Sequence, residues 1–468
     1  MQRMTGMDAA FLYAETPTMH LQSLGVIVLD PPAGGKPLGL RELTAVLTAR
    51  MHLLPSFRRR AVSIPAGIDH PLWIEDPDFE IESHLHAVTV APPGGHGELE
   101  AFVGQMASHP VDRSRPLWEM WLLDGFDDGS IAIVAKLHHA IMDGAGGAEM
   151  LASLFDLSPE PGDAERPAEP WTPDEVPRWA TLVTSSLASF AARQARVPSE
   201  VAYTLSGLTG TVRTWISQRV SGTAGPLTAP RTPFNAPLSP RRVVSLHDVP
   251  LRAVVETKNA FGTKVNDVVL AASAAALRGY LAARGAVPDR PLIAAVPVAD
   301  PANRTESGFG NSVSAMLVAL PMDNLDPVER LRAARDRANA SKQLSVAYGP
   351  EMLRHLTGFV APAVLSSASR LYSGLHLAGL HPPVANLVIS NVAGPPIDLY
   401  LAGARLRAAY PLGPVMEGMG VNITVLSASD ELCVGIIADA ELVDDVGELG
   451  ERFTAAIDEL HQLAAAAV

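Results

Sequence analysis

Short apolar runs alternate with segments of helical spacing along much of the chain. Residues 24–29 (LGVIVL) and 131–137 (IAIVAKL) are continuous apolar runs rich in branched side chains, which is typical of strands buried on both faces. Between them, residues 38–53 place apolar side chains three and four positions apart, as a helix does. Strands interleaved with helices predict an α/β layered fold.

The same rhythm returns in the second half of the chain. An Ala-rich segment at 266–284 predicts a long helix, and Asp326 followed by Pro327 predicts the start of another. A closing helix is expected from residue 447 onward. Further apolar runs predict strands at 243–246, 292–298, 312–320, 385–390, 420–426 and 432–437.

The two halves are separated by residues of different composition. The stretch SPEPGDAERPAEPWTPDEVP is dense in Pro and acidic residues, which predicts an exposed and non-helical connector. Residues 178–219 then have weak helical amphipathicity, before a second Pro-rich stretch. We therefore expect an N-terminal lobe at 1–155, a connector at 156–240 and a C-terminal lobe at 241–468.

Composition excludes several classes of protein. Of the 468 residues 47% are hydrophobic and 18% charged, which excludes a disordered chain. The formal charge of −14 argues against nucleic acid as a partner, because neutralising phosphates needs a basic face. The single cysteine, Cys433, excludes a disulfide framework and indicates a reducing, cytoplasmic compartment. No secretion signal and no run of about 18 uncharged apolar residues is present, so we expect no membrane-spanning segment.

The strongest chemical signal is KLHHAIMDGAGG at residues 136–147. His138 and His139 follow a predicted strand, and Asp143 shares a face with His139 if a helix or turn begins there. Gly144 lets the backbone turn sharply and approach a ligand. A neutral imidazole at such a strand end can act as a general base. A hydrogen-bonded core histidine, a metal-binding pair and a turn-forming Asp143 are alternatives, although no cysteine cluster or HExxH segment supports a metal.

HHAIMDG also fits the HHxxxDG motif of the acyltransferases that include nonribosomal peptide condensation domains and chloramphenicol acetyltransferase. The chain resembles, more narrowly, the bacterial wax ester synthase/acyl-CoA:diacylglycerol acyltransferase family. It departs from the family pattern at Thr5–Met7, at Ala393 and in the segment PVADPANR. The blocks that carry the resemblance are residues 4–24, 55–60, 73–86, 111–125, 229–242, 264–281, 386–400 and 419–436.

The resemblance implies two chloramphenicol acetyltransferase-like lobes with mixed β-sheets and flanking helices, and an active-site tunnel between them. It implies transfer of a long-chain acyl group from acyl-CoA to diacylglycerol or a fatty alcohol, without an acyl-enzyme and with no cofactor or metal. His139 would be the general base and His138 would support the motif loop. Asp143 would organise that loop by pairing with Arg304.

The resemblance also assigns residues outside the motif. Asn266 and Asp267 would lie near the tunnel and orient the thioester, unless Asn266 is simply a helix N-cap. Gly144, through its backbone N–H, and the amide of Asn422 are candidate oxyanion donors. The acyl channel would run beside Pro116, Leu117 and Trp118. These three residues could equally belong to the core.

Contacts with coenzyme A and lipid need further surfaces. The densest basic clusters, Arg58–Arg60 and Arg241–Arg242, are candidates for the coenzyme phosphates, or simply solvated faces. The Trp179–Trp215 region is a candidate for peripheral contact with a membrane or lipid droplet, unless its apolar face covers the core. An acyltransferase fed by a carrier protein and a non-enzymatic lipid-binding protein remain as alternative functions.

Overall fold

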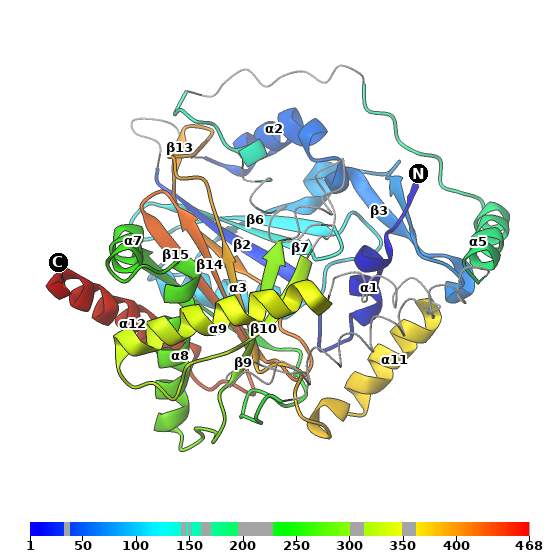
Figure 1. Ribbon diagram of the computed structural model, residues 1–468. Helices are drawn as coiled ribbons and strands as arrows, with labels where there is room; N and C mark the ends of the chain where they lie inside the picture. Colours follow the sequence, from blue (N-terminus) through cyan, green and yellow to red (C-terminus); the bar gives the residue numbers. More distant parts are fainter. Residues whose placement is uncertain are drawn as a thin grey trace.

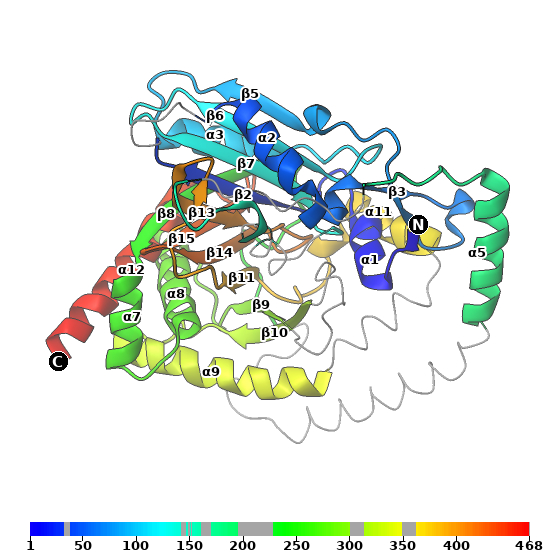
Figure 2. The ribbon, with the colours of Figure 1, turned by 90° about the horizontal axis from the view of Figure 1, so that it is seen from above.

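The computed structural model describes residues 1–31, 38–141, 147, 150, 152–160, 170–194, 228–299, 313–348 and 362–467. Two six-stranded sheets form the centre of the molecule, and helices lie around them (Figure 1, Figure 2). A small third sheet near the N-terminus has the order β1–β4–β3, with strands Gln2–Arg3, Leu72–Glu75 and Arg59–Val62.

The first large sheet has the order β12–β13–β2–β7–β6–β5. Neighbouring strands are antiparallel except β5 and β6, which are parallel, so the sheet is mixed. Its strands are β2 (Gln22–Leu29), β5 (Leu85–Thr89), β6 (Trp118–Asp124), β7 (Ile131–His138), β12 (Tyr400–Leu401) and β13 (Ala404–Leu412).

The second large sheet has the order β10–β9–β11–β14–β15–β8 and is also mixed, because β11 is parallel to both of its neighbours. Two α/β lobes with mixed sheets therefore confirm the expected fold class. The strands are β8 (Arg242–Pro250), β9 (Ile293–Ala299), β10 (Val313–Ala319), β11 (Leu387–Val392), β14 (Val421–Ala428) and β15 (Glu431–Asp439).

Helices cover the sheets and the N-terminal edge. Figure 2 shows α7, α8, α9 and α12 along one side of the second sheet, whereas α1 and α11 lie together at the opposite end of the molecule. The α-helices are α1 (Gly6–Ala14), α2 (Leu40–Arg50), α3 (His96–Ala107), α5 (Trp179–Gln194), α7 (Leu251–Ala260), α8 (Val265–Ala283), α9 (Pro327–Tyr348), α11 (Pro362–Gly374) and α12 (Val446–Ala467). Short 3-10 helices are η1 (Met51–Leu53), η2 (Pro55–Arg58), η3 (Pro65–Gly67), η4 (Ile81–His84) and η6 (Leu377–Gly379).

The division of the chain differs from the sequence expectation at one point. Residues 400–412, which the sequence assigns to the C-terminal lobe, supply β12 and β13 to the N-terminal sheet. The pattern concealed β13 because Pro411 lies inside it, and proline normally argues against a ladder strand. Pro411 is tolerated because β12 pairs only with Arg405 and Ala404, so no partner strand lies opposite Pro411 on that side.

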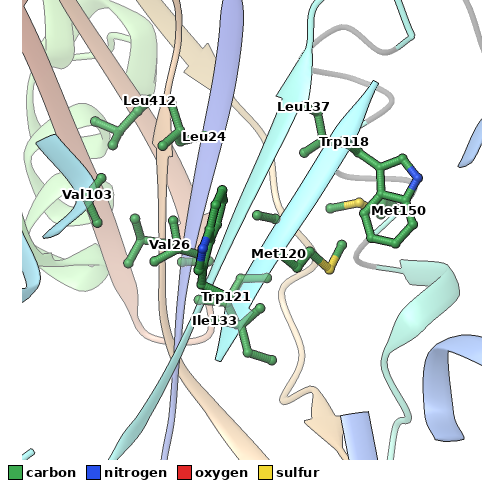
Figure 3. Packing of buried hydrophobic residues seen from close by; sticks show 14 of the residues in the cluster. Leu24, Val26, Val103, Trp118, Met120, Trp121, Ile133, Leu137, Met150 and Leu412 are labelled. Carbon is green, nitrogen blue, oxygen red and sulfur yellow. The ribbon is translucent and has the colours of Figure 1, made fainter. Parts of the chain in front are cut away.

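The apolar core is continuous between the two halves. The cluster around the first sheet includes Val244 and Leu246 of β8 and Cys433 and Ile437 of β15. Figure 3 shows part of this cluster around β2, β6 and β7. Cys433 is fully buried and its burial raises the pKa of the thiol to about 12, so it is a packing residue and no nucleophile.

Arg242 bonds to residues from both halves of the chain. Its guanidinium is buried, pairs with Asp439 at 3.2 Å and donates to the carbonyl of Thr18. Its backbone N–H donates to Oγ of Ser108 at 2.8 Å. A buried cation with these partners is fully engaged in structure, so Arg242 is unsuited to coenzyme phosphates.

Candidate active site at the end of strand β7

The two adjacent histidines lie where β7 leaves the first sheet. The N–H of His138 donates to the carbonyl of Leu117 and that of His139 donates to the carbonyl of Leu21, each at 2.9 Å. The backbone of the two histidines is thus held by the segments that lead into β6 and β2, on either side of β7. Since side chains alternate along an extended segment, the two imidazoles have different surroundings.

His138 is completely buried, and both of its ring nitrogens are engaged. Nδ1 accepts a hydrogen bond from the N–H of Ala140 at 3.0 Å, so this nitrogen carries no proton. Nε2 must then carry the proton and donate to Glu15, whose Oε2 lies 3.2 Å away. Burial lowers the pKa of His138, which keeps the ring neutral. This geometry is what the expected supporting role of His138 requires, and that role stays a prediction.

The same carboxylate oxygen of Glu15 has a second partner. Nε of Arg113 donates to Oε2 of Glu15 at 2.8 Å, and Arg113 also donates to the carbonyl of Leu12 at 2.7 Å. Burial acts to raise the pKa of Glu15, but the hydrogen bond from His138 and the charge of Arg113 outweigh it and hold the pKa below its usual value. The carboxylate therefore stays ionised and links the end of α1 to the end of β7.

His139 is half-buried and is oriented by two residues from other elements. Its Nδ1 lies 3.2 Å from Oγ of Ser23 on β2. The ring of Phe11 on α1 meets the imidazole edge-on, with centroids 4.6 Å apart and planes at 89°. If Nδ1–H donates to the Ser23 hydroxyl, Nε2 carries the lone pair that a general base needs.

The backbone beside His139 is in an unusual conformation. Leu21 has a φ of 46°, in the left-handed region that bulky side chains avoid, and it is 3% exposed. Its carbonyl is the one that accepts from the N–H of His139. Such an outlier next to a candidate base fits the tendency of strained backbone to occur at functional sites.

The segment that carries Leu21 also contacts the second half of the chain. Oγ1 of Thr18 lies 2.9 Å from Oγ of Ser373 and donates to Glu417 at 3.1 Å. Arg242 donates to the carbonyl of Thr18, as described above. The segment that bonds to the backbone of His139 therefore also joins the two halves of the chain.

Several residues expected from the sequence lie outside the described residues. These are Asp143, Gly144 and Arg304. Their roles stay predictions. Within the described ranges, no group of three or more His, Cys, Asp or Glu side chains is placed to hold a metal ion.

The segment Pro116, Leu117 and Trp118 is buried in the N-terminal lobe. The ring of Trp118 stacks on His84 at 4.5 Å and on Phe57 at 4.8 Å, and its Nε1 donates to the carbonyl of Phe57 at 2.8 Å. Figure 3 shows Trp118 within the packed side chains. This surrounding favours a core role for Trp118, while Leu117 supports the site through its carbonyl bond to His138.

The start of α8 is capped differently from the sequence expectation. The N-cap is Lys264, so the prediction of Asn266 as N-cap is wrong. Asp267, at the third helical position, accepts from the N–H of Lys264 at 2.8 Å, and its burial raises the pKa of the carboxyl. The carboxylate of Asp267 therefore caps the helix by reaching back to the N–H of Lys264, in place of a side chain at the N-cap position. In the described residues no contact joins Asn266 or Asp267 to His139, and their orienting role stays a prediction.

Asn422 is buried on β14 and both ends of its amide are engaged. Nδ2 donates to the carbonyl of Pro414 at 2.9 Å, and Oδ1 accepts from Thr424 at 2.7 Å. Because Nδ2 carries a second N–H, the Pro414 bond does not exclude an oxyanion role, which stays a prediction. The basic cluster Arg58–Arg60 is similarly engaged, by Glu75 and Asp76.

Sequence reasoning missed Glu15, Ser23 and Phe11. All three belong to the block at residues 4–24 that resembles the family opening, but that block does not show which of its residues meet the histidines. Glu15 and Ser23 meet the histidines across 123 and 116 residues of chain, which no local spacing can reveal.

Comparison with known proteins decides the family. The model of the wax ester synthase/diacylglycerol acyltransferase catalytic domain matches residues 4–269, and that of the family's C-terminal domain matches residues 309–461. The chain belongs to this family. It is therefore an acyltransferase, which confirms the enzyme interpretation over that of a lipid-binding protein without activity.

Relatives of this acyltransferase match over nearly their whole length. A Mycobacterium tuberculosis protein with the provisional name diacylglycerol O-acyltransferase is 36% identical over 464 residues, which is 98% of this chain and 90% of that protein. The wax ester synthase/diacylglycerol acyltransferase of Marinobacter aquaeolei VT8 has a solved structure that matches with a TM-score of 0.71 and 25% identity, covering 99% of this chain and 100% of that one. The first condensation domain of the calcium-dependent antibiotic synthetase shares the fold, with a TM-score of 0.58 and 16% identity over 99% of this chain and 96% of that one.

Proposed function

We propose that this acyltransferase moves a long-chain acyl group from acyl-CoA to the free hydroxyl of diacylglycerol, and also to long-chain alcohols. The products are triacylglycerol and wax ester. Support comes from the family match and from relatives whose names state diacylglycerol O-acyltransferase. Acyl-CoA is a co-substrate, and the reaction as proposed uses no cofactor.

His139 is the general base in this proposal. The observation that carries it is the contrast within the histidine pair: both nitrogens of His138 are committed to Ala140 and Glu15, whereas His139 is half-buried and is oriented by Ser23 and Phe11. With Nδ1–H donated to Ser23, Nε2 of His139 can accept the proton of the acceptor hydroxyl.

The reaction then needs one tetrahedral intermediate. As the proton passes to Nε2 of His139, the hydroxyl oxygen bonds to the thioester carbonyl carbon, and the carbonyl becomes an oxyanion. Collapse of the intermediate breaks the carbon–sulfur bond, and the imidazolium returns its proton to the leaving thiolate of coenzyme A. No acyl-enzyme forms, and the enzyme's contribution is positioning and proton transfer.

Both substrates are hydrophobic, so we also propose that the enzyme works in the cytoplasm at the surface of a membrane or lipid droplet. None of the described helices is both long and apolar enough to cross a bilayer. Peripheral contact would bring the acceptor to the enzyme without extraction into water.

Release of free thiol from palmitoyl-CoA tests the reaction, with dioleoylglycerol and 1-hexadecanol offered separately. We expect acceptor-dependent release by the wild type and a loss of about 10²- to 10⁴-fold in kcat for His139→Ala. His138→Ala should lose less of its kcat than His139→Ala, when circular dichroism shows that both variants are folded to the same extent. Absence of acceptor-dependent release by folded wild-type enzyme would refute the proposal.

An acyl group on a carrier protein is the alternative donor, which the resemblance of the motif to that of condensation domains leaves open. Condensation domains share the fold, but the starter domain of rhizomide synthetase (TM-score 0.57, 15% identity) is itself solved with C8-CoA, so the fold does not favour a carrier over coenzyme A. Faster turnover of a palmitoyl carrier protein than of palmitoyl-CoA, at equal concentration, would favour the carrier.

A further inference from the structure

Helix α11 packs Leu365 against the core and presents a second apolar stripe to solvent. Val364, Ala368, Leu371 and Leu375 follow the four- and three-residue spacing of one helical face, and all four are exposed, with Val364, Leu371 and Leu375 each at 58%. On another side of the helix, Ser373 is buried. A surface helix normally turns such a stripe toward the core, so this orientation needs an explanation.

Exposed apolar side chains continue beyond the helix. Leu380 is 77% exposed and Val384 50% exposed, in the turn that contains η6. We call Val364, Leu371, Leu375, Leu380 and Val384 the α11 face. Soluble proteins seldom gather apolar side chains outward in this way unless the surface binds something.

The charge of this segment differs from that of the rest of the protein. The chain has a formal charge of −14, yet residues 362–384 contain no Asp or Glu. Arg370 and His376 are exposed there. Glu417 does bond to Ser373, but through the buried side of the helix. Residues 362–384 therefore combine exposed apolar groups with a cation and contribute no carboxylate that would repel anionic headgroups.

From this combination we infer that the α11 face is where the enzyme docks on an anionic lipid surface. The helix lies along the interface, with its leucines among the acyl chains and Arg370 at the headgroups. The inference rests on the proposed lipid-acylating function and adds the surface by which the lipid is met. It differs from the sequence expectation of docking through Trp179–Trp215, most of which lies outside the described residues.

The α11 face is directly connected to the candidate site. Helix α11 packs against α1, which carries Phe11 against His139, as Figure 1 shows for the two helices. Ser373 near its C-terminus donates to Glu417 at 2.6 Å and contacts Thr18. A lipid bound at α11 is thus one helix away from the proposed base.

Helix α5 lies at the same end of the molecule in both views (Figure 1, Figure 2). It packs against η3, as α11 does, and Trp179 at its start is 67% exposed. Leu182 and Ser186 of α5 are buried, so one side of this helix covers the protein. Trp179 is therefore a further exposed apolar side chain at this end of the molecule.

Vesicle flotation of the full-length protein tests the inference. Vesicles of phosphatidylcholine with about one quarter phosphatidylglycerol provide an anionic surface. We expect the wild type to float and the double variant Leu371→Asp/Leu375→Asp to lose on the order of tenfold in bound fraction. Leu325→Asp, on an equally exposed leucine (66%) before α9, is the matched control and should float as the wild type does.

A second variant addresses the charge. Arg370→Glu should weaken flotation with anionic vesicles more than with pure phosphatidylcholine, and added salt should reduce the difference. Wild-type-like flotation of the double leucine variant would overturn the inference. So would a dimer, seen by light scattering, that the double variant dissociates, because the face would then bind a second copy.

Substrate choice separates this inference from the proposed function. With butyryl-CoA and 1-hexanol, both dissolved in water, the double variant should turn over as the wild type does. With dioleoylglycerol in vesicles it should lose activity in parallel with binding. If the wild type floats through α11 but acylates no diacylglycerol even in detergent, the docking surface stands and the acceptor assignment fails.

Discussion

Oε2 of Glu15 lies 3.2 Å from Nε2 of His138, the first histidine of the motif. The opposite nitrogen accepts from the N–H of Ala140, so the ring is a neutral donor toward a carboxylate. The contact between Glu15 and His138 joins the end of α1 to the end of β7 inside the protein. It holds in place the strand end from which His139 projects.

Replacement of Glu15 tests this anchoring. Glu15→Ala leaves the buried N–H of His138 without an acceptor, and we expect a loss of about 1–3 kcal/mol in the free energy of unfolding, measured in urea. Glu15→Gln keeps an acceptor oxygen for His138 and gives up only the ion pair with the half-exposed Arg113. It should therefore lose less stability and less activity. Equal losses for the two variants would show that charge and not the hydrogen bond matters.

Ser23 is expected to position His139. Ser23→Ala removes the hydroxyl 3.2 Å from Nδ1, so the imidazole loses the contact that favours the tautomer with its proton on Nδ1. We expect kcat to fall about tenfold or more with KM for palmitoyl-CoA nearly unchanged. Ser23→Thr retains the hydroxyl and should recover much of kcat.

The tautomer of His139 gives a direct readout. Side-chain ¹⁵N shifts should report a protonated Nδ1 in the wild type and a mixture in Ser23→Ala. A fall in kcat without any change in these shifts would contradict the positioning role.

The central strands and long helices were predictable from local pattern. β2, β7, β9 and α8 carry apolar runs whose length and spacing fix their type, and the structure matches each within two residues. The pattern of α11 is equally regular but does not tell which side faces water. Only the packing against α1 shows that its stripe points outward.

The site was predictable only in part. The motif identified His138 and His139, because two histidines after a buried strand are a rare combination. Their partners were not predictable, because Glu15 and Ser23 reach them through the fold and not through neighbouring sequence. The strained φ of Leu21 likewise has no signature in the amino-acid sequence.

Trp118 is expected to act as a core residue and not as part of an acyl channel. Trp118→Phe loses the bond from Nε1 to the carbonyl of Phe57, so the free energy of unfolding should fall by about 1–3 kcal/mol. KM for palmitoyl-CoA should stay within about twofold of the wild type. The control is Trp171→Phe, at a partly exposed tryptophan whose Nε1 donates to Glu75, where the loss should be smaller. A large rise in KM for Trp118→Phe at modest destabilisation would restore the channel role.

The stability of the enzyme should fall as the solution is acidified through the ordinary histidine range. Burial lowers the pKa of His20, His84, His138 and His247 from the usual 6.5. Below pH 6.5 these histidines bind protons in the unfolded chain but stay neutral in the folded protein. The free energy of unfolding must therefore decrease with falling pH. Each such proton contributes a slope of up to about 1.4 kcal/mol per pH unit. Urea midpoints should therefore drop between about pH 7 and pH 5, above the range where carboxylates titrate. His84→Asn keeps a donor for the carbonyl of Trp118 and should make that drop shallower. A urea midpoint of the wild type that stays constant over this interval would contradict the burial of neutral histidines.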